Sequence, residues 1–366
     1  MSTLVALDIS GAPASTHGRA TGEGAQEPDV FSPELPLVSV IIPCYNGEAF
    51  LREAIESVLT QSYPWVEVVV VDDGSTDGSA RIAQAFDIRY FYQSNQGLTA
   101  SRNLGIRESR GSYIVFLDAD DRLLPDAIAT GLGVLMQRPD CAMTVGDHLF
   151  VSADGTFLSK SRKPFLAAAH YEGLLRSNFI EMISSVIFRR SVFDEAGAFD
   201  TELRVAEDYE LYLRIARNHV MCCHPGVVAE YRLHKTNASH NSELMLTMTL
   251  QVLLRQRPYV LRHLGRLLAF AEGTKRWRKQ YGRQLASELA RTFPALGMKQ
   301  LRRKALVLAN YYPQGLIVVL LLRMMPNLSR RTTPSGGTSL SEQKPLLKKT
   351  HAWLNASKRP EWTPLR

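Results

Sequence analysis

The stretch Val-Ser-Val-Ile-Ile-Pro-Cys-Tyr-Asn (residues 38–46) decides the fold of this chain. Four of its first five residues are β-branched, which is typical of a buried strand, and Pro43 ends the run. Residues 48–61 follow with apolar side chains at helical spacing on one side. A second apolar run, residues 66–71, ends in the turn cluster Asp-Asp-Gly-Ser at 72–75. A strand, a helix and a strand in this order predict the start of a parallel sheet.

The same alternation continues along the next hundred residues. The Asp-Gly pair at 154–155 adds a predicted hairpin between short strands. We therefore expect an α/β fold, with a mostly parallel sheet flanked by helices. The further predicted helices are 79–86, 98–108, 125–139 and 208–218, and the further predicted strands are 89–92, 113–117, 142–145 and 227–233.

Four segments with different composition follow one another along the chain. The first is rich in Gly, Ala, Ser, Pro and Glu without periodicity, and it predicts a disordered arm. The third reads as basic amphipathic helices, interrupted near Gly273, Gly282, Pro294, Gly297 and Pro313. The predicted segments are an arm at 1–36, a catalytic domain at 37–240, a basic C-terminal helical extension at 241–326 and a flexible tail at 327–366.

Positive charge is concentrated in the second half of the 366-residue chain, whose formal net charge is +7. Residues 251–330 carry 16 Lys and Arg but 2 Asp and Glu, whereas residues 1–250 are net acidic. The acidic half argues against nucleic-acid binding there. The basic helices allow two interpretations: peripheral contact with an anionic membrane surface, or packing on the catalytic domain or a second subunit.

The cysteines and the apolar runs predict the compartment. No Cys-x-x-Cys pair is present among the four cysteines, so we expect free thiols in a reducing cytosol. The first residues lack a secretory signal, and the apolar run at 316–322 is far shorter than the ~20 residues that cross a bilayer. We expect a cytoplasmic protein, peripheral at most on the inner face of the cell membrane.

Polar residues follow three of the predicted strands, at 43–46, 72–75 and 118–121. In an open parallel sheet, ligands bind outside the carboxyl ends of the strands. The last cluster, Asp-Ala-Asp-Asp, places three carboxylates within four residues, which suits Mn²⁺ or Mg²⁺. No Gly-x-x-x-x-Gly-Lys-Ser/Thr loop and no Gly-x-Gly-x-x-Gly after the first strand are present, which disfavours P-loop and dinucleotide enzymes.

Five ordered segments together resemble the family 2 glycosyltransferases, over roughly residues 37–240. The resemblance implies the GT-A nucleotide-diphospho-sugar transferase fold and inverting transfer from a nucleoside diphosphate sugar. The five segments are Val-Ser-Val-Ile-Ile-Pro-Cys-Tyr-Asn (38–46), Val-Val-Val-Asp-Asp-Gly-Ser-Thr-Asp (69–77), Ala-Ser-Arg-Asn-Leu-Gly (100–105), Leu-Asp-Ala-Asp-Asp (117–121) and Ala-Glu-Asp-Tyr-Glu-Leu (206–211).

The resemblance assigns the nucleotide side of the site to five residues. It implies that Pro43, Tyr45 and Glu48 border the nucleobase and ribose, with Tyr45 stacked on the base. Asp73 is implied as an acceptor for a base N–H, which suits uracil and hence a UDP-sugar. Arg102 is implied in binding the base or the diphosphate.

The resemblance also assigns the cation and the catalytic base. Asp118 would hold the ribose or orient the metal, and Asp120 would ligate Mn²⁺ or Mg²⁺. His234 lies in a segment that resembles the closing loop of the family (231–239) and would touch the metal or the diphosphate. Asp208 would accept the proton of the acceptor hydroxyl.

Three functions compete at this point. The chain lacks the Gln-x-x-Arg-Trp motif of processive members, so we expect transfer of one sugar to a carbohydrate or lipid-linked acceptor. A non-catalytic nucleotide-sugar-binding protein with the same fold is the alternative, and the intact carboxylates argue against it. A nucleotidylyltransferase would need a Gly-rich basic first loop, and residues 43–48 do not supply one.

Overall fold

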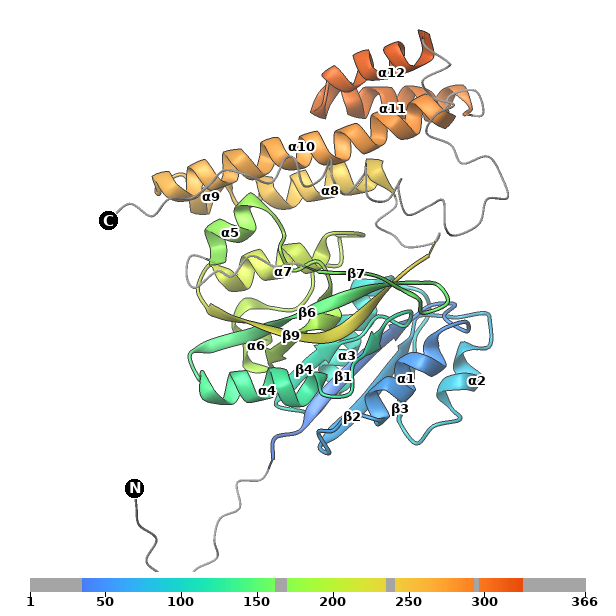
Figure 1. The fold of residues 1–366 in the computed structure, drawn as a ribbon, viewed down its shortest axis with the longest axis vertical. Coiled ribbons are helices and arrows are strands. Elements are labelled where there is room, and N and C mark those ends of the chain that lie inside the picture. The colour runs from blue at the N-terminus through green and yellow to red at the C-terminus, as the bar shows by residue number, and fades with distance from the viewer. Residues whose placement is uncertain (1–34, 162–169, 235–240, 293–295, 325–366) are drawn as a thin grey trace, which may run out of the picture. The chain divides into compact units, whose positions relative to one another are not determined.

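The computed structural model describes residues 35–161, 170–234, 241–292 and 296–324 (Figure 1). The chain divides into residues 1–35 and a compact unit from Pro36 onward, and all that follows concerns the second unit. The predicted tail and nearly all of the predicted arm lie outside the described residues. The strands are β1 (Val38–Cys44), β2 (Val66–Asp72), β3 (Arg89–Tyr92), β4 (Tyr113–Phe116), β5 (Arg122–Leu123), β6 (Cys141–Ser152), β7 (Phe157–Lys160), β8 (Val186–Arg189) and β9 (Val220–Leu233).

The helices fall into two groups, one around the sheet and one in the C-terminal extension. The first group is α1 (Leu51–Leu59), α2 (Ser79–Ala83), α3 (Leu98–Glu108), α4 (Ala127–Gln137), α5 (His170–Arg176), the 3₁₀ turn η1 (Ile183–Ser185), α6 (Ser191–Ala196) and α7 (Glu207–Ala216). The second group is α8 (Ser242–Leu254), α9 (Arg257–Val260), α10 (Leu264–Thr292), α11 (Met298–Tyr311) and α12 (Gln314–Met324).

One sheet in the order β3-β2-β1-β4-β8-β6-β9-β5 organises the described part of the chain, with β7 paired to β6. The first four strands are parallel, and β1 lies between β2 and β4, with Val38 opposite both Val66 and Tyr113. The second half is mixed, because β8 runs antiparallel to both β4 and β6, while β9 runs parallel to β6. The predicted α/β class is confirmed.

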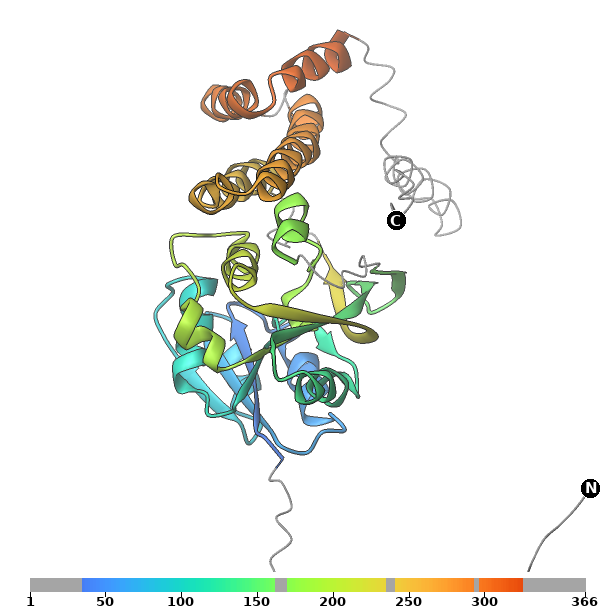
Figure 2. The same ribbon diagram turned by 90° about the vertical axis from the view of Figure 1, so that its left-hand side faces the viewer.

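Both faces of the parallel half are buried, which explains its continuous apolar runs. Side chains alternate across a strand, so Ile41 and Val69 enter one core while Val40 and Val70 enter the other. Helix α3 packs on the first face, and a Cβ at its Gly105 would come within 2.2 Å of Ile41. Helices α1 and α4 cover the second face, and Figure 2 shows helices on both sides of the strands.

Two of the predicted helix interruptions are wrong, because α10 runs without a break through Gly273 and Gly282. A Cβ at Gly273 would lie 1.8 Å from the carbonyl oxygen of Leu175, and one at Gly282 would lie 2.5 Å from the Tyr312 ring. These glycines permit close packing and do not end a helix. In the described residues no helix combines the length and apolar character needed to cross a membrane.

Two strands are longer than predicted, since β6 and β9 extend over twelve and fourteen residues. Their pairing is interrupted by a bulge, where the register moves from Val145 opposite Cys223 to Asp147 opposite Val227. The intervening His-Pro-Gly at 224–226 reads as a turn in sequence, which is why the prediction began β9 too late. The predicted hairpin is confirmed as β6 and β7.

The prediction of four free thiols is wrong for two of them. Cys141 and Cys222 form a disulfide with Cα atoms 6.0 Å apart. They lie 81 residues apart in sequence and meet only because β6 pairs with β9, so no local spacing could reveal the bond. Cys44 is a free cysteine.

Candidate active site

The three polar strand ends meet at one edge of the sheet, as predicted. Strands β2, β1 and β4 are neighbours, and all three run in the same direction. The backbone N–H of Asp73 donates to the carbonyl of Cys44 at 2.8 Å, which ties the end of β2 to the end of β1. The acidic cluster at 118–121 directly follows β4, so it stands beside both.

A buried guanidinium joins the two halves of this site. Arg102 of α3 is 2% exposed, and it donates to Asp118 at 2.7 Å and to Glu207 at 2.6 Å. Burial alone would lower the pKa of Arg102, but the two carboxylates reverse this and raise it. The role that the resemblance implies for Arg102, binding of the base or the diphosphate, stays a prediction. In the structure, Arg102 is the cation that connects the acidic cluster to the start of α7.

Asp208 occupies the first turn of α7, next to this ion pair, and is half-buried. Burial and the neighbouring Glu207 raise the pKa of Asp208 to about 7, and Arg102 limits the increase. The preceding Ala206 has a left-handed backbone conformation with φ of 59°, unusual for a residue with a Cβ. A carboxylate that titrates near neutral pH is well suited to accept a proton.

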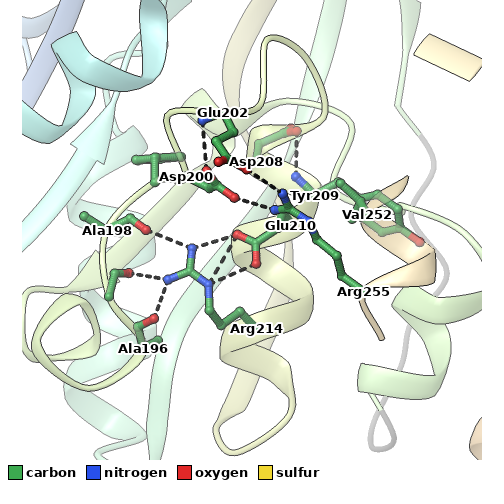
Figure 3. A network of polar contacts seen from close by, with 12 residues as sticks. Ala196, Ala198, Asp200, Glu202, Asp208, Tyr209, Glu210, Arg214, Val252 and Arg255 are labelled. Atoms are coloured by element: carbon green, nitrogen blue, oxygen red, sulfur yellow. Dashed lines mark hydrogen bonds and ion pairs between the residues drawn. The ribbon is translucent and has the colours of Figure 1, made fainter. Parts of the chain in front are cut away.

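A second network fixes the loop that leads into α7 (Figure 3). Arg214 pairs with Glu210 at 2.7 Å and donates to backbone carbonyls of residues 196–198. Arg255, which directly follows α8, pairs with Asp200 and Glu202. These contacts tie residues 196–202, which precede α7 in the chain, to α7 itself and to Arg255.

The end of β9 folds back onto the acidic cluster. His234 lies 2.7 Å from the Oδ2 atom of Asp120, and its ring stacks on Phe50 with centroids 5.4 Å apart. Burial and the charge of Asp118 raise the pKa of Asp120, although His234 opposes this. The structure therefore brings together the two residues predicted to contact the metal.

Arg232, which the sequence did not assign, supports this arrangement. Its backbone N–H donates to Asp121 and its Nε donates to the carbonyl of Asp120, both at 2.9 Å. Its guanidinium also contacts Glu53 at 2.7 Å and lies over the Phe50 ring. Arg232 lies in β9 and His234 follows the last residue of that strand, and no spacing in the sequence shows that Arg232 contacts Asp120 and Asp121.

A divalent cation fits the donor set but needs more ligands than the described residues supply. No group of three or more His, Cys, Asp or Glu side chains is arranged to hold a metal in the ranges that the structure describes. Asp120 and His234 offer one carboxylate and one imidazole side by side. Mn²⁺ and Mg²⁺ commonly take their remaining ligands from water and substrate phosphates. The fully buried Asp121 has one oxygen with no hydrogen-bond partner among the described residues.

The residues predicted to bind the nucleobase lie around the ends of β1 and β2. Tyr45 is 54% exposed just beyond the buried Pro43, so its ring is accessible for stacking. Glu48 accepts from the backbone of Gly78 at 3.0 Å. Asp73 is buried, and both of its oxygens accept backbone N–H groups of residues 96 and 97 at 2.8 Å. Contact of these residues with a nucleotide stays a prediction.

Comparison with known proteins identifies the family. A sequence model described as "Glycosyl transferase family 2" matches residues 39–197. TuaG of Bacillus subtilis, a glycosyltransferase provisionally named for teichuronic acid biosynthesis, is 31% identical over 56% of this chain and 82% of its own length. The chain belongs to glycosyl transferase family 2. This chain matches 67%, 33% and 64% of the length of three further curated glycosyltransferases, from Rickettsia typhi, Rickettsia bellii and Haemophilus influenzae.

Solved structures agree with this family 2 assignment at the level of the fold. TarS of S. aureus (residues 1–349, crystallised with UDP-GlcNAc) superposes with a TM-score of 0.51 at 18% identity, covering 75% of this chain and 80% of that one. The mannosyltransferase PcManGT of Pyrobaculum calidifontis (with GDP-Man and Mn²⁺) gives 0.50 at 21% identity, covering 79% and 87%. The fold is the GT-A fold predicted from sequence, and the protein is a transferase.

Proposed function

We propose that this family 2 glycosyltransferase moves one sugar from a nucleoside diphosphate sugar, preferentially a UDP-sugar, to a hydroxyl of a carbohydrate or lipid-linked acceptor. The observation that carries the proposal is the position of Asp208, half-buried beside the ion pair of Arg102 with Asp118. This arrangement supports a role for Asp208 as the catalytic base, with the nucleotide bound at the sheet edge formed by the ends of β1, β2 and β4. The relatives crystallised with UDP-GlcNAc and with GDP-Man support a nucleotide-sugar donor.

Direct displacement with inversion is the reaction that this geometry supports best. The acceptor oxygen attacks the anomeric carbon while the bond to the nucleoside diphosphate breaks, and Asp208 takes the proton of the acceptor hydroxyl. One base suffices for this step, in contrast to hydrolysis by a pair of carboxylates. Arg102 and the second network hold Asp208 in place, since both tie the start of α7 to the rest of the domain.

Asp120 and His234 are the residues that would hold Mn²⁺ or Mg²⁺, and Asp118 would orient the ribose or the cation. Such a cation, when bound, stabilises the charge that develops on the leaving diphosphate. Tyr45 would stack on the base, with Pro43, Glu48 and Asp73 around it. The mannosyltransferase structure that contains Mn²⁺ supports this assignment.

We also propose that the chain works in the cytoplasm, at the inner face of the cell membrane. Helix α11 supports this, because Met298 and Leu306 are 78% and 61% exposed, and Arg302 is exposed between them at helical spacing. Exposed apolar and cationic side chains on one face suit an anionic lipid interface. Co-sedimentation of the chain with anionic vesicles, compared between the natural protein and Leu306→Glu, tests this placement.

The decisive experiment measures the release of nucleoside diphosphate from a panel of sugar donors, with and without Mn²⁺. A glycosyltransferase releases the diphosphate, whereas the non-catalytic alternative binds donors without turnover and a nucleotidylyltransferase releases pyrophosphate. Anomeric configuration in the product, determined by NMR, separates inversion from retention. Donor binding without any release across the panel and a range of acceptors would count against the proposal.

A further inference from the structure

A cavity lies outside the candidate active site, between the end of α7 and the start of α10. It has a volume of about 260 Å³, close to the lower limit of the ~300–1,000 Å³ that is typical of ligand pockets. Figure 1 shows α9 and the first turns of α10 at the same end of the helical extension. The lining residues are Arg217, Asn218, Pro258, Tyr259, Arg262, His263 and Arg266.

The lining of this cavity is strongly cationic. Three guanidinium groups and one imidazole face a space with no carboxylate among its lining residues. Outside the lining, Glu172 accepts from the Nε of Arg266 at 3.2 Å, and within the part of the chain that the structure describes the two terminal nitrogens of that guanidinium form no hydrogen bond. Like charges this close repel one another unless an anion compensates them.

Two of the three guanidinium groups have N–H donors that no acceptor among the described residues uses. Within the described residues, neither Arg217 nor Arg262 forms an ion pair or a side-chain hydrogen bond. Arg217 lies 3.9 Å from the centroid of the Tyr259 ring, and its buried Nε has no acceptor. Stacking on an aromatic ring restrains the guanidinium while its N–H groups remain able to donate.

Three of the lining residues lie at the N-terminus of α10, where an anion is favoured. Arg262, His263 and Arg266 surround the N-terminus of a 29-residue helix that has no acidic residue in its first turn. The N-terminal end of a helix carries partial positive charge, so cations there are unfavourable and anions are stabilised. The chain therefore places positive side chains where the helix itself already favours an anion.

We infer that this cavity binds a phosphate-bearing anion, as a phosphate or diphosphate group. Arginine matches phosphate oxygens through paired N–H donors, and three guanidiniums suit a group with two or three negative charges better than a single carboxylate. The phosphate could belong to a free ligand or to the headgroup of an anionic lipid. The site is separate from the donor site, so it does not rest on the proposed function.

The test is calorimetric titration of the full chain with inorganic pyrophosphate, in a buffer that contains EDTA. We expect the natural chain and the control Arg278→Glu to bind alike, because Arg278 is exposed on α10 outside the cavity. Arg262→Glu and Arg217→Gln should bind at least about tenfold more weakly, since each loses a charge-assisted contact. Absence of binding to the natural chain, or equal affinity in all four proteins, overturns the proposal.

Vesicle co-sedimentation distinguishes the two sources of phosphate. If a lipid headgroup occupies the cavity, Arg262→Glu weakens sedimentation with phosphatidylglycerol vesicles and Arg278→Glu does not. If a free phosphate occupies it, pyrophosphate binding is lost in Arg262→Glu while sedimentation matches that of Arg278→Glu. Donor turnover measured on the same variants should be unchanged, which separates failure of this cavity from failure of the proposed function.

Discussion

The guanidinium of Arg102 lies 2.6 Å from the carboxylate of Glu207, a residue 105 positions later in the chain. This contact connects α3, which packs on the parallel half of the sheet, to the first turn of α7, which contains the proposed base Asp208. The pair is buried, and it fixes Glu207, the residue directly before Asp208, to α3. Several properties of the protein depend on this arrangement.

Replacing Arg102 should destabilise the whole domain. In Arg102→Gln, two carboxylates lose their buried counter-charge, and breaking such a pair costs about 3–5 kcal/mol. Urea unfolding measures the loss. Arg107→Gln is the control, because Arg107 is exposed on the same helix and its replacement should change stability by less than about 0.5 kcal/mol. Equal unfolding midpoints of the two variants would contradict the structural role of Arg102.

Activity should depend on the ionisation of Asp208. Because the pKa of Asp208 is raised to about 7, kcat/KM should increase with pH and level off above that value. Asp208→Asn should lower turnover about 10²–10⁴-fold while leaving donor binding intact. Initial rates across pH 5–9, with donor affinity measured separately, check both statements. If Asp208→Asn retained full turnover, the base would have to be another residue.

The ionised carboxylate of Asp208 should lower the free energy of unfolding at neutral pH. Its pKa rises on folding from 3.8 to about 7, so the folded state binds the proton more tightly. Below pH 3.8 the carboxyl group of Asp208 is protonated in both the folded and the unfolded state, so it does not change the free energy of unfolding. As the pH rises from 3.8 to about 7, the unfolded state loses the proton first, and the free energy of unfolding falls. Asp208→Asn should therefore raise the Tm at pH 8 but not at pH 4. Asp194→Asn, an exposed control, should change the Tm at neither pH.

Removing the cation should abolish turnover, and Mn²⁺ should restore it. Asp120→Asn removes the carboxylate from one of the two adjacent side chains proposed to hold the metal. The Mn²⁺ concentration for half-maximal activity should therefore rise at least about tenfold. The exposed Asp126→Asn is the control and should leave this concentration unchanged. Product release assayed over a Mn²⁺ series, after treatment with EDTA, provides the measurement. A metal response identical in the two variants would exclude Asp120 as a ligand.

The sequence predicted the parallel half of the fold and the meeting of three polar strand ends at one edge, because both depend on local patterns. Apolar runs marked β1, β2 and β4, and the polar residues after them meet at one edge as expected. The contacts of Arg232 and the Cys141–Cys222 disulfide were missed. Both depend on the pairing and bulge of β6 and β9, which arise from long-range packing and leave no short-range signal.

Long-range packing also explains the wrong prediction in the helical extension. Gly273 predicts a helix end in the sequence, but in the structure it allows α10 to pack closely on α5. In Gly273→Ala the new Cβ would meet the Leu175 carbonyl at 1.8 Å, so α10 must shift away from α5. Overpacking of this kind costs about 1–3 kcal/mol. Gly265→Ala is the matched control on the same helix, where nothing lies within 4 Å of the added Cβ. It should be neutral or stabilising, because alanine favours helix. Thermal unfolding of both variants decides, and an unchanged Tm for Gly273→Ala would show that α10 does not pack as closely on α5 as described.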